Sequence, residues 1–203
     1  NGQSLSRIDN LLSPRLGVVV KPKDNLSLYS SYSVSYLPSS GDQFATLTVA
    51  TDTLKPEKLE NYEIGAKWDI RPSLNVTAAI YQLDRTNTSA TDPNDPTQLV
   101  PTGASRTRGI ELETTGRITD KWQIIGGYAY QDAEITKTTT AAAAGKKVAL
   151  VPQNMVSLWN KYDLTPKWAT AVGIIYQSDQ FAAVDNTVRL KGYTRFDGAV
   201  YYD

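Results

Sequence analysis

The side chains whose spacing could support catalysis are two glutamates, Glu111 and Glu113. Paired carboxylates serve as acid, base or nucleophile in glycoside hydrolysis. Glu63, Lys67 and Asp69 form a second charged set, again at even spacing. Because alternate residues of a β-strand point to the same face, each set also fits a strand with one polar face. The opposite faces are uniformly apolar, which favours a polar wall over an active site.

The composition removes most other chemistries. The 203 residues include no cysteine and no histidine, which excludes disulfides, thiolate or histidine zinc sites and Ser-His-Asp catalysis. Twenty-one basic and 21 acidic residues give a net charge of zero, which does not favour a nucleic-acid partner. We therefore expect a chain that is not an enzyme, has no metal site or cofactor of its own and does not bind nucleic acid.

Hydrophobic residues alternate with polar ones along most of the chain. In 62–70 one face carries Tyr62, Ile64 and Trp68, whereas the other carries Glu63 and Lys67. This period of two predicts half-apolar β-strands. The predicted strands are 15–21, 25–36, 57–70, 74–85, 105–118, 122–135, 153–164, 168–178 and 192–203. All ten prolines lie outside these segments, as expected because proline cannot donate to a sheet ladder.

The connections between the strands alternate in length. Short turns are centred near residues 22, 72, 120 and 166, and the long connections are 37–56, 86–104, 136–152 and 179–191. No apolar run reaches the roughly 18 to 20 residues that a membrane helix needs. Barrel strands escape this test because only every second side chain faces lipid. Alternating short and long connections are typical of an up-and-down membrane barrel.

Three of the four tryptophans lie beside short turns. Trp122 and Trp168 each follow one, in the similar strings Thr119-Asp-Lys-Trp122 and Thr165-Pro-Lys-Trp168, and Trp68 precedes another. Tryptophan prefers the boundary between membrane and water. The three side chains are therefore predicted to mark one rim of the barrel.

Several strings resemble the TonB-dependent receptor family. Pro56-Glu57 followed by Tyr62-Glu-Ile-Gly-Ala-Lys67 resembles a family signature, and Thr107-Arg-Gly-Ile-Glu-Leu-Glu113 is similar to its Gly-x-Glu-x-Glu strand. The remaining similar strings, in family order, are 74–81, 84–87, 127–132, 151–154 and 192–197. Residues 39–44 and 92–96 look most like loops of receptors for catecholate-type siderophores.

The resemblance implies an all-β fold, an antiparallel up-and-down transmembrane β-barrel of 22 strands that encloses an N-terminal plug. Residues 1–203 would form a single partial barrel domain of about nine strands, from the C-terminal part of the barrel. The plug, the segment that contacts TonB and the last strands are expected to be missing from it. The implied location is the outer membrane of a Gram-negative bacterium. Glycines inside the strands are expected to allow close approach of the plug, or a bulge.

The function implied by the resemblance is TonB-dependent active uptake of ferric siderophores. Iron would travel inside the siderophore, so no cofactor is expected. The expected partners are the ferric siderophore, outer-membrane lipid, the receptor's own plug and, through the missing N-terminal region, the TonB complex. An anionic iron–catecholate complex calls for guanidinium groups and aromatic faces. Candidate ligand contacts, at long connections and lumenal strand ends, are Phe44, Tyr81, Arg85, Arg106, Arg108 and Phe181.

Other hypotheses remain open on the sequence alone. The barrel could import haem, vitamin B12 or a glycan, which a panel of ligands would distinguish. A diffusion porin would reveal itself by conductance. A soluble β-rich adhesion or binding module would pack its apolar faces together as a sandwich and stay in solution without detergent.

Overall fold

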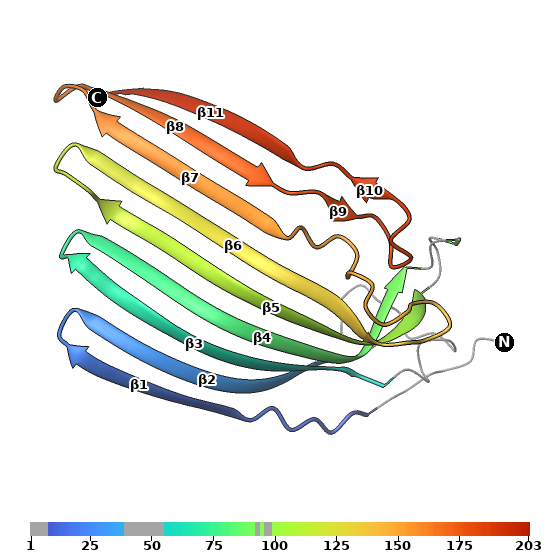
Figure 1. The fold of residues 1–203 in the computed structure, drawn as a ribbon. Coiled ribbons are helices and arrows are strands. Elements are labelled where there is room, and N and C mark those ends of the chain that lie inside the picture. The colour runs from blue at the N-terminus through green and yellow to red at the C-terminus, as the bar shows by residue number, and fades with distance from the viewer. Residues whose placement is uncertain (1–7, 39–54, 92–93, 96–98) are drawn as a thin grey trace.

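A single antiparallel sheet of nine strands dominates the computed structural model, which describes residues 8–38, 55–91, 94–95 and 99–203 (Figure 1). Sequential strands are neighbours throughout, in the order β1-β2-β3-β4-β5-β6-β7-β8-β11. The nine strands are β1 (Arg15–Lys23), β2 (Leu26–Leu37), β3 (Glu57–Arg71), β4 (Leu74–Thr91), β5 (Leu99–Arg117), β6 (Trp122–Lys137), β7 (Asn154–Asp163), β8 (Trp168–Gln177) and β11 (Tyr193–Tyr202). Between β8 and β11, a small hairpin pairs β9 (Gln180–Phe181) with β10 (Arg189–Leu190). The predicted strands and their order are confirmed.

The strand register gives the sheet two chemically different faces. Residues paired across antiparallel strands lie on the same face, and Ile64, Ile80 and Ile110 are paired in succession across β3, β4 and β5. We call the face with these isoleucines the outer face. The inner face carries Glu63, which is paired with Tyr81, and the other residues in phase with them. The predicted separation of apolar and polar side chains is therefore confirmed.

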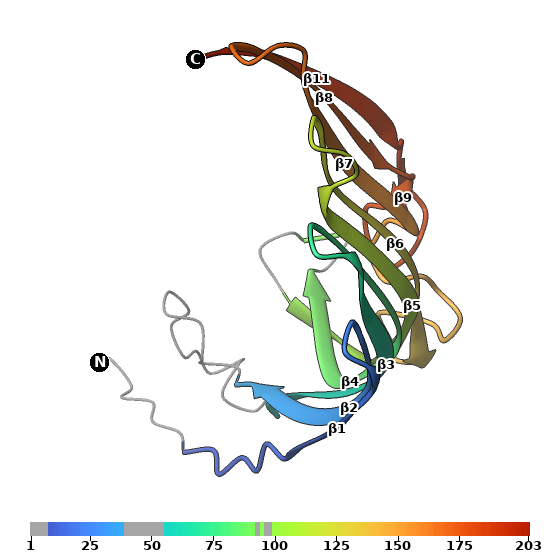
Figure 2. The ribbon, with the colours of Figure 1, turned by 90° about the vertical axis from the view of Figure 1, so that its left-hand side faces the viewer.

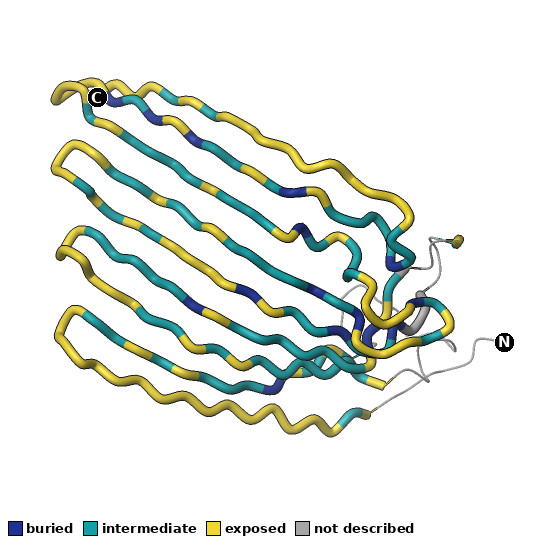
Figure 3. Tube along the Cα trace, in the orientation of Figure 1, coloured by how far each residue is buried: buried dark blue, intermediate teal, exposed yellow. Residues whose placement is uncertain are grey.

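The sheet curves like part of a cylinder wall (Figure 2). Few of its side chains are buried (Figure 3), and outer-face residues are widely exposed, including Ile64 at 59%, Val172 at 52% and Phe196 at 70%. A soluble protein rarely leaves so continuous an apolar surface in contact with water, whereas lipid would solvate it. Within the described ranges, no helix has the length and apolar character to cross a membrane.

Three of the four tryptophans lie as predicted, at one end of the sheet. Trp68, Trp122 and Trp168 all point to the outer face beside short turns. The two similar strings form equivalent turns, since the Thr119 hydroxyl accepts the N–H of Trp122 at 3.1 Å and the Thr165 hydroxyl accepts that of Trp168 at 3.0 Å. The repeated threonine explains why both turns present a tryptophan at the same level.

The predicted long connection 86–104 was wrong, because β4 and β5 continue through most of it. Beyond Thr86 the β4–β5 hairpin bends toward the concave side of the curved sheet (Figure 2). The bend coincides with register shifts between Thr86 and Ser89, and with positive φ angles of 57° at Asn87 and 82° at Gly103. Such left-handed residues reverse the local direction of a strand at little cost when they are asparagine or glycine.

Two prolines lie inside strands, contrary to the prediction. Pro22 belongs to β1, the edge of the sheet, where the register with β2 is irregular between Val20 and Lys23. Pro101 pairs with Ser89 of β4, beyond Ala104, the last residue of β5 that pairs with β6. Both prolines therefore occupy places with a neighbour on one side only, where a missing N–H costs no ladder bond.

Candidate functional site

The middle of the inner face is acidic and hydrogen-bonded. The Tyr29 hydroxyl donates to Oε1 of Glu63 at 2.6 Å, and the Lys67 ammonium lies 5.9 Å from the centre of the Tyr29 ring. Glu111 and Glu113 stand side by side on the same face of β5. They belong to a polar wall and do not oppose each other across a cleft, so the geometry does not support acid–base catalysis by this pair.

Aromatic rings of the inner face lie over glycines of the next strand. Methyl groups built on Gly65 and on Gly173 would collide with the rings of Tyr29 and Trp159, respectively, and one built on Gly109 would lie 2.5 Å from the Tyr81 ring. The three glycines therefore make room for a neighbouring ring. The close fit fixes the orientation of Tyr81. Approach of the plug to the other strand glycines stays a prediction.

A small cavity lies at the bend of the β4–β5 hairpin, beside Arg85. Nε of Arg85 binds Glu57 at 2.5 Å, and the buried Thr88 and Thr102 share a hydrogen bond of 2.8 Å. The cavity has a volume of about 450 Å³, and its walls combine the hydroxyl groups with aliphatic side chains and the guanidinium group. Lining residues include Arg85, Thr88, Thr102, Ser105, Ile135 and Val184.

Two long connections close over this region as one unit. Asn186, with a φ of 55°, accepts the N–H of Lys147 at 2.7 Å and donates to its carbonyl at 2.9 Å. Ile135, Ala142 and Val184 form a buried cluster beneath these bonds. Burial lowers the pKa of Lys147, but hydrogen bonds to Asp132 and Glu134 raise it by more. Lys147 therefore stays charged and ties residues 136–152 to β6.

The structure divides the candidate ligand residues between the two faces. Tyr81 and Arg85 lie on the inner face, as expected. Arg106 and Arg108 share the outer face with Ile110, so the expectation of a lumenal position is wrong for both. Arg106 binds Asp84 there at 2.5 Å.

The two aromatic candidates in the long connections have different outcomes. The Phe181 ring lies in β9, 5.2 Å from the Arg189 guanidinium. Phe44 lies outside the described residues. Contact of any candidate with a ligand stays a prediction. The sequence reasoning missed Glu57, Thr88, Thr102 and Asn186, and only the asparagine carries a local signal, its tolerance of positive φ.

The surroundings of the small cavity suit binding, because they combine the guanidinium group of Arg85 with hydroxyl groups and aliphatic side chains. The model for the TonB dependent receptor-like β-barrel family matches residues 1–203. The chain belongs to this family. Its all-strand, antiparallel sheet is a section of the TonB-dependent receptor barrel.

Known members of the receptor family resemble the chain over nearly all of its length. The probable TonB-dependent siderophore receptor PiuA of Acinetobacter baumannii is 34% identical, over 92% of this chain and 27% of the relative. The crystal structure of PiuA superposes with a TM-score of 0.79 at 32% identity, over 93% of this chain and 29% of that one. The closed form of the ferric-catecholate import receptor Fiu of Escherichia coli superposes with a TM-score of 0.78 at 27% identity, over 93% of this chain and 28% of the Fiu chain. The chain thus spans less than a third of the length of these TonB-dependent receptors.

Replacing Asn186 with alanine is expected to loosen the two joined connections without unfolding the sheet. The variant loses both bonds to the Lys147 backbone, each worth about 1 kcal/mol, so amide hydrogen exchange at Lys147 should accelerate roughly tenfold or more. Thr187→Ala is the control, because the Thr187 hydroxyl binds Asp185 within its own loop. Equal exchange in the two variants would show that Asn186 does not join the connections.

Proposed function

We propose that this chain forms part of the wall of an outer-membrane receptor for TonB-dependent uptake of ferric siderophores. The observation that carries the proposal is membership of the receptor family together with similarity to PiuA, named a siderophore receptor, and to Fiu, named a ferric-catecholate import receptor. The cargo is an anionic iron complex in which the siderophore supplies every iron ligand. No cofactor of the protein takes part.

In the proposed mechanism, the barrel binds the ferric siderophore, and the energised TonB complex causes its release. The cargo would bind at the end of the sheet with the long connections, on the inner side, where Arg85 offers charge and Tyr81 an aromatic face. A plug inside the barrel and the TonB complex would complete the receptor. The acidic middle of the inner face would repel an anionic cargo. The cargo would therefore stay at the end of the sheet with the long connections until the plug moves.

The direct test is uptake of a radiolabelled ferric catecholate siderophore by cells carrying the complete receptor, with and without TonB. We expect accumulation only when TonB is present. Equal uptake in both strains would contradict active transport. Binding of a panel with haem, vitamin B12 and oligosaccharides tests the cargo, and preference for one of these over ferric siderophores would replace the proposed substrate.

Two arginines on adjacent strands provide a matched test of the ligand site. Arg85 and Arg106 each bind a carboxylate at 2.5 Å, but on opposite faces. Arg85→Gln should weaken binding of the ferric siderophore roughly tenfold, since a charge-assisted hydrogen bond contributes about 1.5–3 kcal/mol. Arg106→Gln should leave the dissociation constant unchanged. Equal losses in the two variants would contradict a binding site on the inner face.

A further inference from the structure

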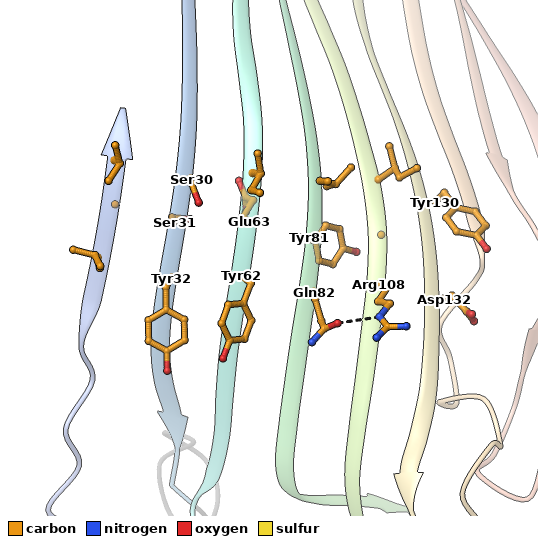
Figure 4. A pocket seen from close by; sticks show the side chains of 17 residues that line it. Ser30, Ser31, Tyr32, Tyr62, Glu63, Tyr81, Gln82, Arg108, Tyr130 and Asp132 are labelled. Carbon is orange, nitrogen blue, oxygen red and sulfur yellow. Dashed lines mark hydrogen bonds between the residues drawn. The ribbon is translucent and has the colours of Figure 1, made fainter. Parts of the chain in front are cut away.

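An open hollow of about 780 Å³ lies across β1 to β6 (Figure 4). Most side chains that line it belong to the outer face, and its surface is largely apolar. Leu16, Val18, Ile64, Ile80 and Ile110 supply aliphatic surface. The hollow therefore faces the membrane, on the opposite side of the sheet from the proposed cargo site.

The hollow changes from apolar to aromatic to charged along the strands. Toward the long connections, Ile64 is followed on the same face by Tyr62, and Ile110 by Arg108. Tyr32 packs against Tyr62 with ring centres 4.9 Å apart. This is the order in which a bilayer changes from acyl chains to head groups, since tyrosine concentrates at the interface.

Arg108 differs from its cationic neighbours on this face. Lys58 is paired with Glu60 at 3.0 Å, Arg106 with Asp84 at 2.5 Å, and Lys147 with both Asp132 and Glu134. Nε of the exposed Arg108 instead donates to the neutral amide oxygen of Gln82 at 2.9 Å (Figure 4). Among the described residues, no ion pair involves Arg108.

The free side of this guanidinium suits one class of ligand. Its two terminal amino groups can form parallel hydrogen bonds to a phosphate. Asp132, the residue of β6 paired with Arg108, carries the nearest negative charge in the register, and it is bound by Lys147, which it shares with Glu134. A lipid head group would thus meet a cation at the level where the apolar hollow ends, as in anionic-lipid sites on membrane proteins.

We propose that the outer face binds one phosphorylated lipid of the outer leaflet, with its phosphate on Arg108 and an acyl chain in the hollow over Ile64, Ile80 and Ile110. The Gln82 amide orients the guanidinium, and Tyr62 and Tyr130 flank the region where head group and acyl chain join. This site requires only that the outer face contacts lipid. It is independent of the cargo and of TonB.

The test uses the complete receptor purified in detergent, with lipid A as the probe in two forms, carrying its phosphates or with them removed. Native mass spectrometry measures how much of each form stays bound. Wild type should retain the phosphorylated form at least about tenfold better, and Arg108→Gln should lose most of that preference. Arg108→Lys, which keeps the charge without the planar fork, should retain an intermediate amount.

A control and a competitor complete the design. Arg195→Gln removes an exposed arginine of the inner face and should bind both forms as wild type does. Inorganic phosphate at millimolar concentration should not displace the lipid. Equal retention of the two forms by wild type, no effect of Arg108→Gln, or displacement by free phosphate would each overturn the proposal.

Discussion

Replacing Ile64 with arginine is expected to lower the free energy of unfolding in a lipid bilayer by about 2–4 kcal/mol. Ile64 lies on the outer face, is 59% exposed and is paired with Ile80 in the middle of the apolar band. A charge placed there has to leave water and enter hydrocarbon without a partner. Urea-induced unfolding of the complete receptor in vesicles, followed by tryptophan fluorescence, measures the change.

Lys67→Gln is the matched control on the same strand. Lys67 lies on the inner face, where a polar side chain remains among polar neighbours, so its loss should change the free energy of unfolding by less than about 1 kcal/mol. Equal losses of unfolding free energy in the two variants would show that the two faces do not differ in their surroundings.

Gly116→Ala is the second substitution for which we expect a large loss of stability. Gly116 adopts a φ of 138°, which side chains rarely accept, and a methyl group there would collide with the carbonyl oxygen of Ser73 and lie 2.8 Å from Cα of Leu74. These are backbone atoms and cannot rotate away. Strain of this kind costs about 1–3 kcal/mol, which should appear as a lower midpoint of urea unfolding.

Gly127→Ala shows whether any loss is specific to position 116. A methyl group on Gly127 would have its nearest neighbour, the carbonyl oxygen of Leu112, at 3.9 Å, an ordinary contact. Its unfolding midpoint should match that of wild type. An unchanged midpoint for Gly116→Ala as well would mean that the turn after β3 is not packed against β5 as described.

The strands and their faces were predictable because a membrane wall imposes a strict period of two. Ile64 and Glu63 could be assigned to opposite faces from the sequence alone, and the register confirms the assignment. The same parity places Arg106 and Arg108 in phase with Ile110. The alternation of the sequence therefore predicts their outer position as well.

The continuation of β4 beyond Arg85 has no such signal. Residues 86–91 are Thr-Asn-Thr-Ser-Ala-Thr, which are small or polar on both faces. A strand with no apolar side to present shows no alternation, so the segment looked like a loop.

Side-chain contacts between neighbouring strands were not predictable from the sequence either. The fit of Tyr81 over Gly109 depends on which residues are opposed, and the cavity beside Arg85 depends on the bend at Asn87. Register and bending arise from long-range pairing, which one sequence does not specify.

A cysteine scan of residues 62–70 in the outer membrane tests the central claim most directly, and the chain suits it because it contains no cysteine. A fluorophore attached at each position in turn reports quenching by a lipid-restricted agent and by a water-soluble one. Labels at Tyr62, Ile64 and Trp68 should respond to the lipid agent, and those at Glu63 and Lys67 to the aqueous agent. Uniform quenching along the segment, or the reverse assignment of faces, would contradict a barrel wall with its apolar face in lipid.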